Sequence, residues 1–332
     1  EESGFSVNQT MWDFYTTGAA KDIRMDQKDI AGSGRYLIHE ASVDMFTANE
    51  EASFSDYSDA AIVVFARSGG ESGDIPVEYD ESYAEDLDIE GYLGSIHSDA
   101  VDSPEDIGRS YLELTYNEEQ LLEYASANFD TVIVLINSGN AMELSFLDKE
   151  EYGIDAALWI GNPGQDGLYA VGEILDGAVN PSGKTVDTYA YDPTKAPAVQ
   201  NFGAYTMTGA DDKVNNMYVV YAEGIYSGYR YYETRYEDVI LGQGNASDAI
   251  GTSTEGASSW NYDDEVQFPF GFGLSYTSFE TELLSSKASD DDYEFEIKVT
   301  NTGDVAGKDV VELYLQNPYT DYDKSAGIEK SA

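Results

Sequence analysis

The sequence predicts an α/β fold: a doubly wound, mostly parallel sheet sandwiched by helices, followed by an incomplete β-sandwich. Over the first two-thirds of the chain, apolar runs of strand length alternate with helical segments, which is typical of βαβ units. After about residue 276, apolar and polar residues alternate, as in half-buried strands. The change of hydrophobic pattern between these two parts indicates more than one domain, and a length of 332 residues permits about two domains.

The first predicted strand covers residues 61–67 and follows the polar segment Asp56–Asp59. Because its apolar residues are continuous and rich in β-branched side chains, we expect it to be buried on both faces. Thr115 and Glu118 have the spacing of a capping box, which predicts a helix over Tyr116–Ala127.

Two further strands and one helix complete the predicted sheet domain. The strands are Thr131–Ile136, closed by the polar turn Asn137–Asn140, and Ala156–Ile160, closed by Gly161–Gly164. The helix covers Leu168–Leu175 and is ended by the glycines and proline that follow it.

We expect three regions: an α/β domain over 1–203, a Tyr- and Gly-rich wrapping and connecting segment over 204–275, and a partial β-sandwich over 276–332. We interpret 204–265 as long loops. Strands are predicted from the alternation of Tyr293, Phe295, Ile297 and Val299, and from Val311, Leu313 and Leu315. A β-sandwich needs about seven strands, and the first residues resemble the end of a βα unit without its strand. The chain is therefore expected to be incomplete at both ends.

Composition excludes several classes of function. Lys and Arg number 17 against 64 Asp and Glu, so the formal net charge of −47 opposes binding of nucleic acid or anionic lipid. Cysteine is absent, and the two histidines, His39 and His97, are expected to be surface or packing residues. We therefore predict no cofactor and no metal site. No apolar run approaches the roughly 20 residues of a membrane span.

The main candidate for chemistry is the glycine-rich segment Arg67–Asp74, directly after the first predicted strand. Open α/β sheets place ligands at the carboxyl ends of their strands. Glu71 lies in this segment between glycines that permit close approach of backbone and substrate. The alternative is a surface loop with a solvated glutamate.

Other polar segments have structural interpretations. Gly161–Gly167 lacks the spacing of a nucleotide-binding loop, so we interpret it as a turn from strand to helix. The tyrosines of Tyr221–Tyr232, beside Glu223 and Arg230, could stack on sugars, but packing against the sheet is favoured. Asp290–Asp292 is interpreted as a solvated turn, and Glu143 as a residue at the start of a helix.

Six segments in sequence order resemble glycoside hydrolase family 3, specifically its α/β-sandwich domain and the beginning of its fibronectin-type-III-like domain. They are Arg67–Asp74, Asn137–Leu144, Trp159–Gln165 leading into Asn180–Lys184, Tyr221–Tyr232, Phe268–Tyr276 and Asn301–Lys308. The resemblance runs over essentially the whole chain. Two details differ from the family pattern. Glu71-Ser-Gly-Asp74 replaces the usual Glu-Gly-x-Asp, and Phe272 stands where His or Tyr is common.

The resemblance implies the acid/base-bearing portion of a retaining exo-β-glycosidase, a β-glucosidase or β-xylosidase that hydrolyses β-linked oligosaccharides or glycosides from the non-reducing end. Glu71 matches the family's general acid/base. The nucleophile is an Asp on a (β/α)8 barrel, which this chain lacks, so the barrel is expected on the same or a companion polypeptide. No substrate-binding residue can be assigned from the resemblance.

We expect a nearly ordinary, solvent-exposed Glu71 and no hydrolysis by this chain alone. The alternative function is a non-catalytic carbohydrate-binding or structural module with the same fold. The acidic composition favours a secreted or cell-surface protein over a cytoplasmic one.

Overall fold

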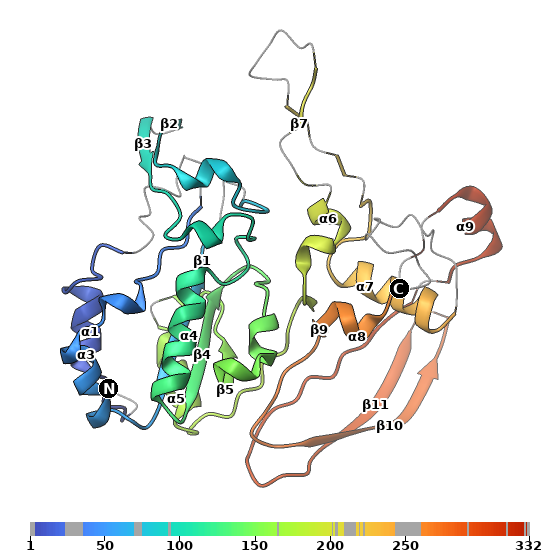
Figure 1. The fold of residues 1–332 in the computed structure, drawn as a ribbon. Helices are drawn as coiled ribbons and strands as arrows, with labels where there is room; N and C mark the ends of the chain where they lie inside the picture. Colours follow the sequence, from blue (N-terminus) through green and yellow to red (C-terminus); the bar gives the residue numbers. More distant parts are fainter. Residues whose placement is uncertain are drawn as a thin grey trace.

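In the computed structural model of the chain, two lobes lie side by side (Figure 1). The structure describes residues 4–23, 36–69, 75–91, 94–164, 166–200, 202, 205–208, 217–218, 220–221, 223–242, 260–290, 292–316, 318–328 and 330. The first lobe contains the N-terminus and a parallel sheet, and the second contains short helices, a long hairpin and the C-terminus.

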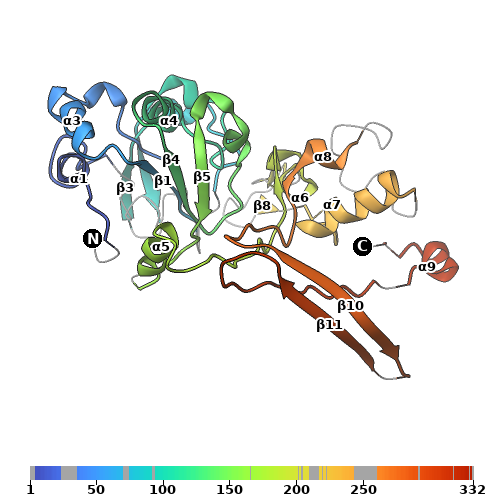
Figure 2. The same ribbon diagram turned by 90° about the horizontal axis from the view of Figure 1, so that it is seen from below.

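The sheet of the first lobe has three parallel strands in the order β1-β4-β5. They are β1 (Ala61–Arg67), β4 (Val132–Ser138) and β5 (Ile154–Trp159). Helix α4 (Tyr116–Asn128) lies on one face and α5 (Leu168–Leu175) on the other, as Figures 1 and 2 show together. The predicted α/β class, a parallel sheet with helices, is therefore confirmed.

The N-terminal part and the connections of this lobe are made of short elements. The helices are α1 (Gln9–Thr16), α3 (Ala48–Ser53) and the 3-10 turns η1 (Val43–Met45), η2 (Phe54–Asp56), η3 (Glu81–Ala84), η4 (Pro104–Asp106), η5 (Ser145–Asp148) and η6 (Glu150–Tyr152). The hairpin β2 (Leu87–Gly91) and β3 (Gly94–Ser98) lies between β1 and α4 in sequence.

Local signals account for the main elements of the sheet. The Thr115 hydroxyl accepts a hydrogen bond from the Glu118 amide at 3.3 Å, and a Glu118 carboxylate oxygen accepts from the Thr115 amide at 2.9 Å. This capping box satisfies two donors at the start of α4, so the helix begins where the spacing predicts and ends one residue later. Helix α5 has the predicted bounds.

Burial of β1 on both faces was expected and is wrong. Val63 and Phe65 are buried in the main core, but Ile62 and Val64 on the opposite face are 46% and 50% exposed. Strand β1 lies at the edge of the described sheet, whereas the central β4 has no exposed residue. An apolar run alone does not distinguish these two positions.

The second lobe is built around a cluster of aromatic residues. Tyr226, Tyr231, Tyr232 and Trp260 are buried together with Val266. The other elements of this part of the chain are η7 (Pro193–Lys195), α6 (Pro197–Gln200), α7 (Tyr229–Arg235), the π-helical η8 (Tyr236–Ile240), α8 (Tyr262–Glu265) and the antiparallel pairs β6 (Tyr189–Ala190) with β9 (Val266–Phe268) and β7 (Tyr205–Thr206) with β8 (Met217–Tyr218). The prediction of long loops over 204–265 is thus wrong for the described helical parts, where buried aromatic side chains hold short helices in place.

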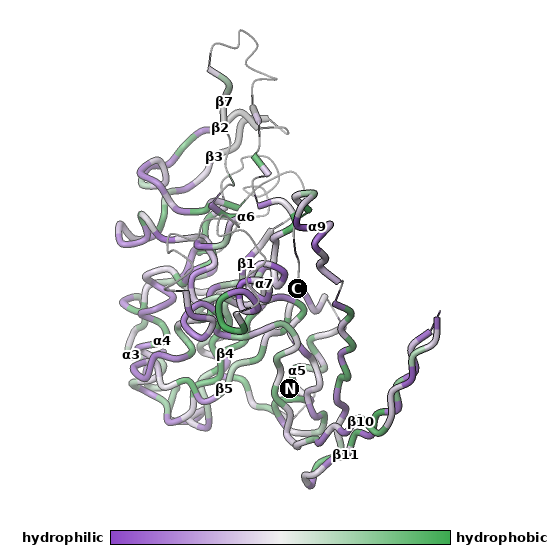
Figure 3. The backbone as a smooth tube through the Cα atoms, turned by 90° about the vertical axis from the view of Figure 1, so that its right-hand side faces the viewer, coloured by the Kyte–Doolittle hydropathy of each residue, from purple (hydrophilic) through white to green (hydrophobic). Residues whose placement is uncertain are grey.

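The C-terminal region forms a hairpin of β10 (Phe279–Ala288) and β11 (Tyr293–Asn301), followed by α9 (Asp321–Ala326). Figure 3 shows hydrophobic and hydrophilic residues along both strands of the hairpin. The predicted strand at Val311–Leu315 is wrong: this segment has no regular secondary structure and no ladder, and Leu315 is 81% exposed. Alternation supplies one apolar face, but a strand also requires a neighbouring backbone to pair with.

The proposed regions 1–203, 204–275 and 276–332 remain predictions. Among the described residues, every helix is too short or too polar to cross a lipid bilayer.

Candidate functional site

Glu71, the predicted acid/base, lies in residues 70–74, outside the described part of the chain. The structure does describe how both sides of that segment are held. Ser68 and Gly69 continue from the carboxyl end of β1, and Ile75 begins the next described segment. The described part of the candidate site therefore consists of the residues before and after this segment in the chain, together with the loops that follow β4 and β5.

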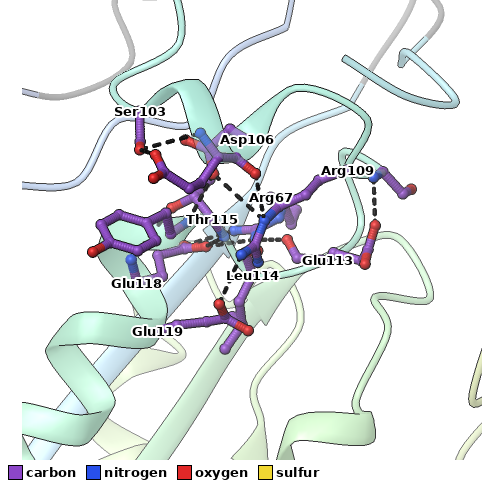
Figure 4. A network of polar contacts seen from close by, with 12 residues as sticks. Arg67, Ser103, Asp106, Arg109, Glu113, Leu114, Thr115, Glu118 and Glu119 are labelled. Atoms are coloured by element: carbon purple, nitrogen blue, oxygen red, sulfur yellow. Dashed lines mark hydrogen bonds and ion pairs between the residues drawn. The ribbon is translucent and has the colours of Figure 1, made fainter. Parts of the chain in front are cut away.

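Arg67, the last residue of β1, is 2% exposed and uses its whole guanidinium group (Figure 4). Nη1 and Nη2 donate to the two carboxylate oxygens of Glu118, at 2.8 and 2.7 Å. The other donors contact backbone carbonyl oxygens: Nε that of Tyr111 at 2.8 Å, Nη1 that of Ala66 at 2.9 Å, and Nη2 that of Glu113. These are the five donors that an arginine possesses. Arg67 thus has no N–H left for a substrate and supports the loop that follows it.

The charge of Arg67 is permanent. Burial by itself would lower the pKa of Arg67, but the adjacent Glu118 carboxylate outweighs this effect and raises it. Because Glu118 also caps α4, the ion pair joins the end of β1 to the start of the helix. Both partners are buried, so losing either one would leave an uncompensated charge in the protein interior.

Tyr111 holds Ser68, the first residue after β1, through the two peptide groups that flank it. Its hydroxyl donates to the Ser68 carbonyl oxygen at 2.8 Å and accepts from the Ser68 amide at 3.0 Å. The ring is fully buried and packs edge-on against Tyr36 and Tyr79. Burial raises the pKa of Tyr111 to about 12, against the opposing effect of Arg67, so the hydroxyl keeps the proton that it donates.

The loops that follow the three parallel strands touch one another through glycine and asparagine. A Cβ atom on Gly69 would lie 2.7 Å from the side-chain nitrogen of Asn140, and one on Gly139 would lie 2.6 Å from that of Asn162. Glycine at both positions therefore permits the close approach of each loop to the next. Ser138 holds the middle loop, since its hydroxyl donates to the Asn140 carbonyl oxygen at 2.8 Å.

Two hollows lie against this edge of the sheet. A polar one of about 500 Å³ is lined by Ala66, Arg67, Ser68, Gly69, Asn137, Gly139, Asn140 and Asn162. A mainly apolar one of about 370 Å³ is lined by residues that include Gly69, Ile75, Val77, Leu112, Val199 and Phe202. Gly69 belongs to both, so both hollows reach the last described residue before the segment that carries Glu71.

Most of the remaining residues that the sequence singled out lie in turns or in packed clusters. Glu143 lies two residues before η5 and accepts a hydrogen bond from the Ser145 hydroxyl at 2.6 Å; burial raises its pKa. Gly161 and Gly164 have φ of +58° and +64°, as expected for a turn before α5. The favoured packing of the predicted tyrosines against the parallel sheet is wrong: Tyr231 and Tyr232 are buried in the aromatic cluster of the second lobe, whereas Tyr221 is 78% exposed.

Sequence reasoning did not identify Tyr111 or the role of Arg67 and Glu118. The capping box singled out Glu118, but nothing in the sequence connects it to an arginine 51 residues away. The asparagines of the polar hollow lie in segments that the sequence predicts as turns, because each segment follows an apolar run, although Asn137 belongs to the end of β4.

Residues 38–229 match the family model of the glycosyl hydrolase family 3 C-terminal domain. A β-glucosidase from Ruminococcus albus is 34% identical over 226 residues, and β-glucosidase A from Butyrivibrio fibrisolvens is 30% identical over 331 residues. These alignments cover 67% and 93% of this chain, but 20% and 34% of the relatives. The chain thus spans about a fifth to a third of the length of these curated relatives.

Solved structures agree with the sequence matches. A β-glucosidase from Paenibacillus barengoltzii matches 90% of this chain, and 25% of its own, with a TM-score of 0.57 and 26% identity. β-Glucosidase 3B from Thermotoga neapolitana, solved with glycerol, shares the fold over 90% of this chain and 31% of its own, with a TM-score of 0.54 and 23% identity. Since the family model covers more than half of the residues, the chain belongs to glycosyl hydrolase family 3 and carries its C-terminal α/β domain.

Proposed function

We propose that this chain is the acid/base-bearing portion of a retaining exo-β-glycosidase, a β-glucosidase that hydrolyses β-linked sugars at the non-reducing end. The observation that carries the proposal is the family match over residues 38–229, which includes Glu71 directly beyond the carboxyl end of β1. The names of the relatives, β-glucosidases, support glucosides as the substrate class.

The proposed mechanism requires two carboxyl groups about 5–5.5 Å apart. One is the nucleophile, an Asp on a (β/α)8 barrel outside these 332 residues, and attacks the anomeric carbon. Glu71 protonates the leaving oxygen and then, as a base, takes a proton from the water that hydrolyses the glycosyl-enzyme. Its pKa must be raised for the first step, which burial and the nearby nucleophile would achieve on docking of the barrel.

The described residues would position this carboxyl group and do no chemistry themselves. Arg67 and Tyr111 hold the start of the loop through contacts that leave the guanidinium without a spare donor. The polar hollow beside the loop offers amide groups, which suit the hydroxyl groups of a neutral sugar. The isolated chain has one of the two carboxyl groups, so we expect no turnover from it.

The test is Glu71→Gln in an enzyme that contains this chain together with its barrel. We expect hydrolysis of unactivated β-glucosides to fall by a factor of about 10² to 10⁴, the usual contribution of general acid–base catalysis. Aryl glucosides with good leaving groups should retain more activity, and azide should restore part of it by replacing the base-activated water. The matched control is Glu78→Gln, because Glu78 is exposed in the segment after the loop.

Equal activity of Glu71→Gln and the unchanged enzyme would refute the assignment. It would favour the alternative, a non-catalytic carbohydrate-binding or structural module. Hydrolysis of a nitrophenyl β-glucoside by the purified 332-residue chain would refute the proposed division of the two carboxyl groups between domains.

A further inference from the structure

The β2–β3 hairpin carries four ionisable side chains on one face. Asp88 and His97 are direct partners in the antiparallel ladder, and Leu87 pairs with Ser98. Successive side chains of a strand point to opposite faces. Asp86 directly precedes β2 and Asp99 directly follows β3, each two residues from that pair, and their contacts with His97 place them on the same face. Sequence spacing does not reveal this group, because its members come from both strands of the hairpin.

Three of these side chains direct donor atoms at one point. His97 Nε2 lies 3.2 Å from Asp99 Oδ1 and 3.9 Å from Asp86 Oδ2. The three ligand atoms all lie within 4.8 Å of one another. Ligands held at about 2.0–2.2 Å from a tetrahedral zinc ion are separated by roughly 3.3–3.6 Å. The observed separations need only small side-chain rotations to reach that geometry.

Two further contacts orient the ligand atoms. Asp88 Oδ1 lies 3.3 Å from His97 Nδ1, so a proton on Nδ1 faces a carboxylate and the Nε2 lone pair can face a metal. Histidines that bind metals commonly have such an outer carboxylate, which fixes the tautomer and the ring orientation. The Ala100 amide donates to Asp86 Oδ1 at 2.9 Å, which leaves Oδ2 toward the imidazole.

The donor set also selects the kind of ion. The imidazole nitrogen separates this group from an ordinary cluster of surface carboxylates, because Ca²⁺ and Mg²⁺ take oxygen ligands whereas Zn²⁺ and similar ions readily accept histidine. Two carboxylates would neutralise the charge of a divalent ion. His97 is 58% exposed, so an ion and its remaining water ligands could reach the group without opening the core.

We propose that Asp86, His97 and Asp99 bind one divalent transition-metal ion of the Zn²⁺ type, with Asp88 as the outer carboxylate that orients His97. The ion joins the start of β2 to the end of β3. This site is separate from the proposed glycosidase chemistry and does not depend on it.

The test is calorimetric titration of the full 332-residue chain with Zn²⁺, together with the visible spectrum of the Co²⁺ form, which reports nitrogen coordination. We expect one saturable site per chain. His97→Gln should weaken Zn²⁺ binding at least tenfold, and Asp88→Asn by about 10- to 100-fold, the usual effect of losing an outer carboxylate. The control Asp304→Asn removes an exposed carboxylate elsewhere and should leave binding unchanged.

Equal Zn²⁺ affinity of His97→Gln and the unchanged chain would overturn the proposal and indicate general binding by an acidic surface. The absence of saturable binding at 100-fold excess Zn²⁺, or equal displacement of Zn²⁺ by Ca²⁺, would also overturn it. Circular dichroism spectra of the two hairpin variants should match the unchanged chain, because the substituted side chains are exposed. None of these measurements uses glycosidase activity.

Discussion

Replacing Glu40 by Gln should stabilise this chain at pH 8 and change its stability little at pH 4.5. Glu40 accepts hydrogen bonds from the Tyr15 hydroxyl at 3.0 Å and the Ala41 amide at 2.9 Å, both at Oε1. Burial is the main reason that its pKa rises from 4.5 to about 7, with Glu118 and Asp102 adding negative charge nearby. A glutamine keeps the acceptor oxygen for both hydrogen bonds but never ionises.

The magnitude follows from linkage between protonation and folding. The folded chain binds the Glu40 proton more tightly than the unfolded chain. The contribution of Glu40 to the unfolding free energy is therefore fully present below pH 4.5 and is lost as the pH rises to about 7. A gap of about 2.5 pH units at about 1.4 kcal/mol per unit corresponds to roughly 3.5 kcal/mol. Above pH 7 the wild-type chain should therefore be less stable than Glu40→Gln by about this amount.

Urea denaturation of both chains at pH 4.5, 6 and 8 measures the difference in unfolding free energy, in which the other titrating groups largely cancel. Glu123→Gln is the matched control, because it removes one negative charge from the exposed face of α4. Its effect should be small and similar at all three pH values. If Glu40→Gln gave no gain at pH 8, or the same gain at pH 4.5, the inferred burial of an ionised Glu40 would be wrong.

Three further predictions concern the support of the candidate loop. Glu118→Gln should reduce the unfolding free energy by about 3–5 kcal/mol, because it leaves Arg67 buried without its counter-charge; urea denaturation measures this, and the double variant Arg67→Met/Glu118→Leu should recover much of the loss. Tyr111→Phe should cost about 1–3 kcal/mol and speed hydrogen exchange at the Ser68 amide, and unchanged exchange would contradict the described contact. Gly139→Ala should cost about 1–3 kcal/mol in thermal denaturation, since its Cβ would meet the side chain of the neighbouring loop, and a neutral effect would show that this side chain moves away at little cost.

The elements with strong local signals could be predicted closely. The capping box determined where α4 begins, and the apolar run that became β4 was found, although the strand extends two residues into the predicted turn. These signals act within one turn of helix or one strand, so they are present in the sequence itself. The glycine-rich segment with Glu71 was likewise recognisable, although its role as acid/base remains a proposal.

Contacts between distant residues could not be predicted. The pairing of Arg67 with Glu118 depends on where the end of β1 meets the start of α4, and local patterns carry no information about that meeting. The same holds for the hydroxyl of Tyr111 on Ser68 and for the facing strands that assemble the proposed metal site around His97.

The sequence by itself determined the α/β class, the main helix bounds, the charge and the family, because each depends on composition or on residues close together in the chain. Only the tertiary structure decided which face of β1 is covered, that Val311–Leu315 has no ladder, and how the arginine beside the candidate loop is neutralised. The physical reason is that burial and strand pairing require two surfaces in contact. The local sequence pattern determines the character of each surface but not which other surface it contacts.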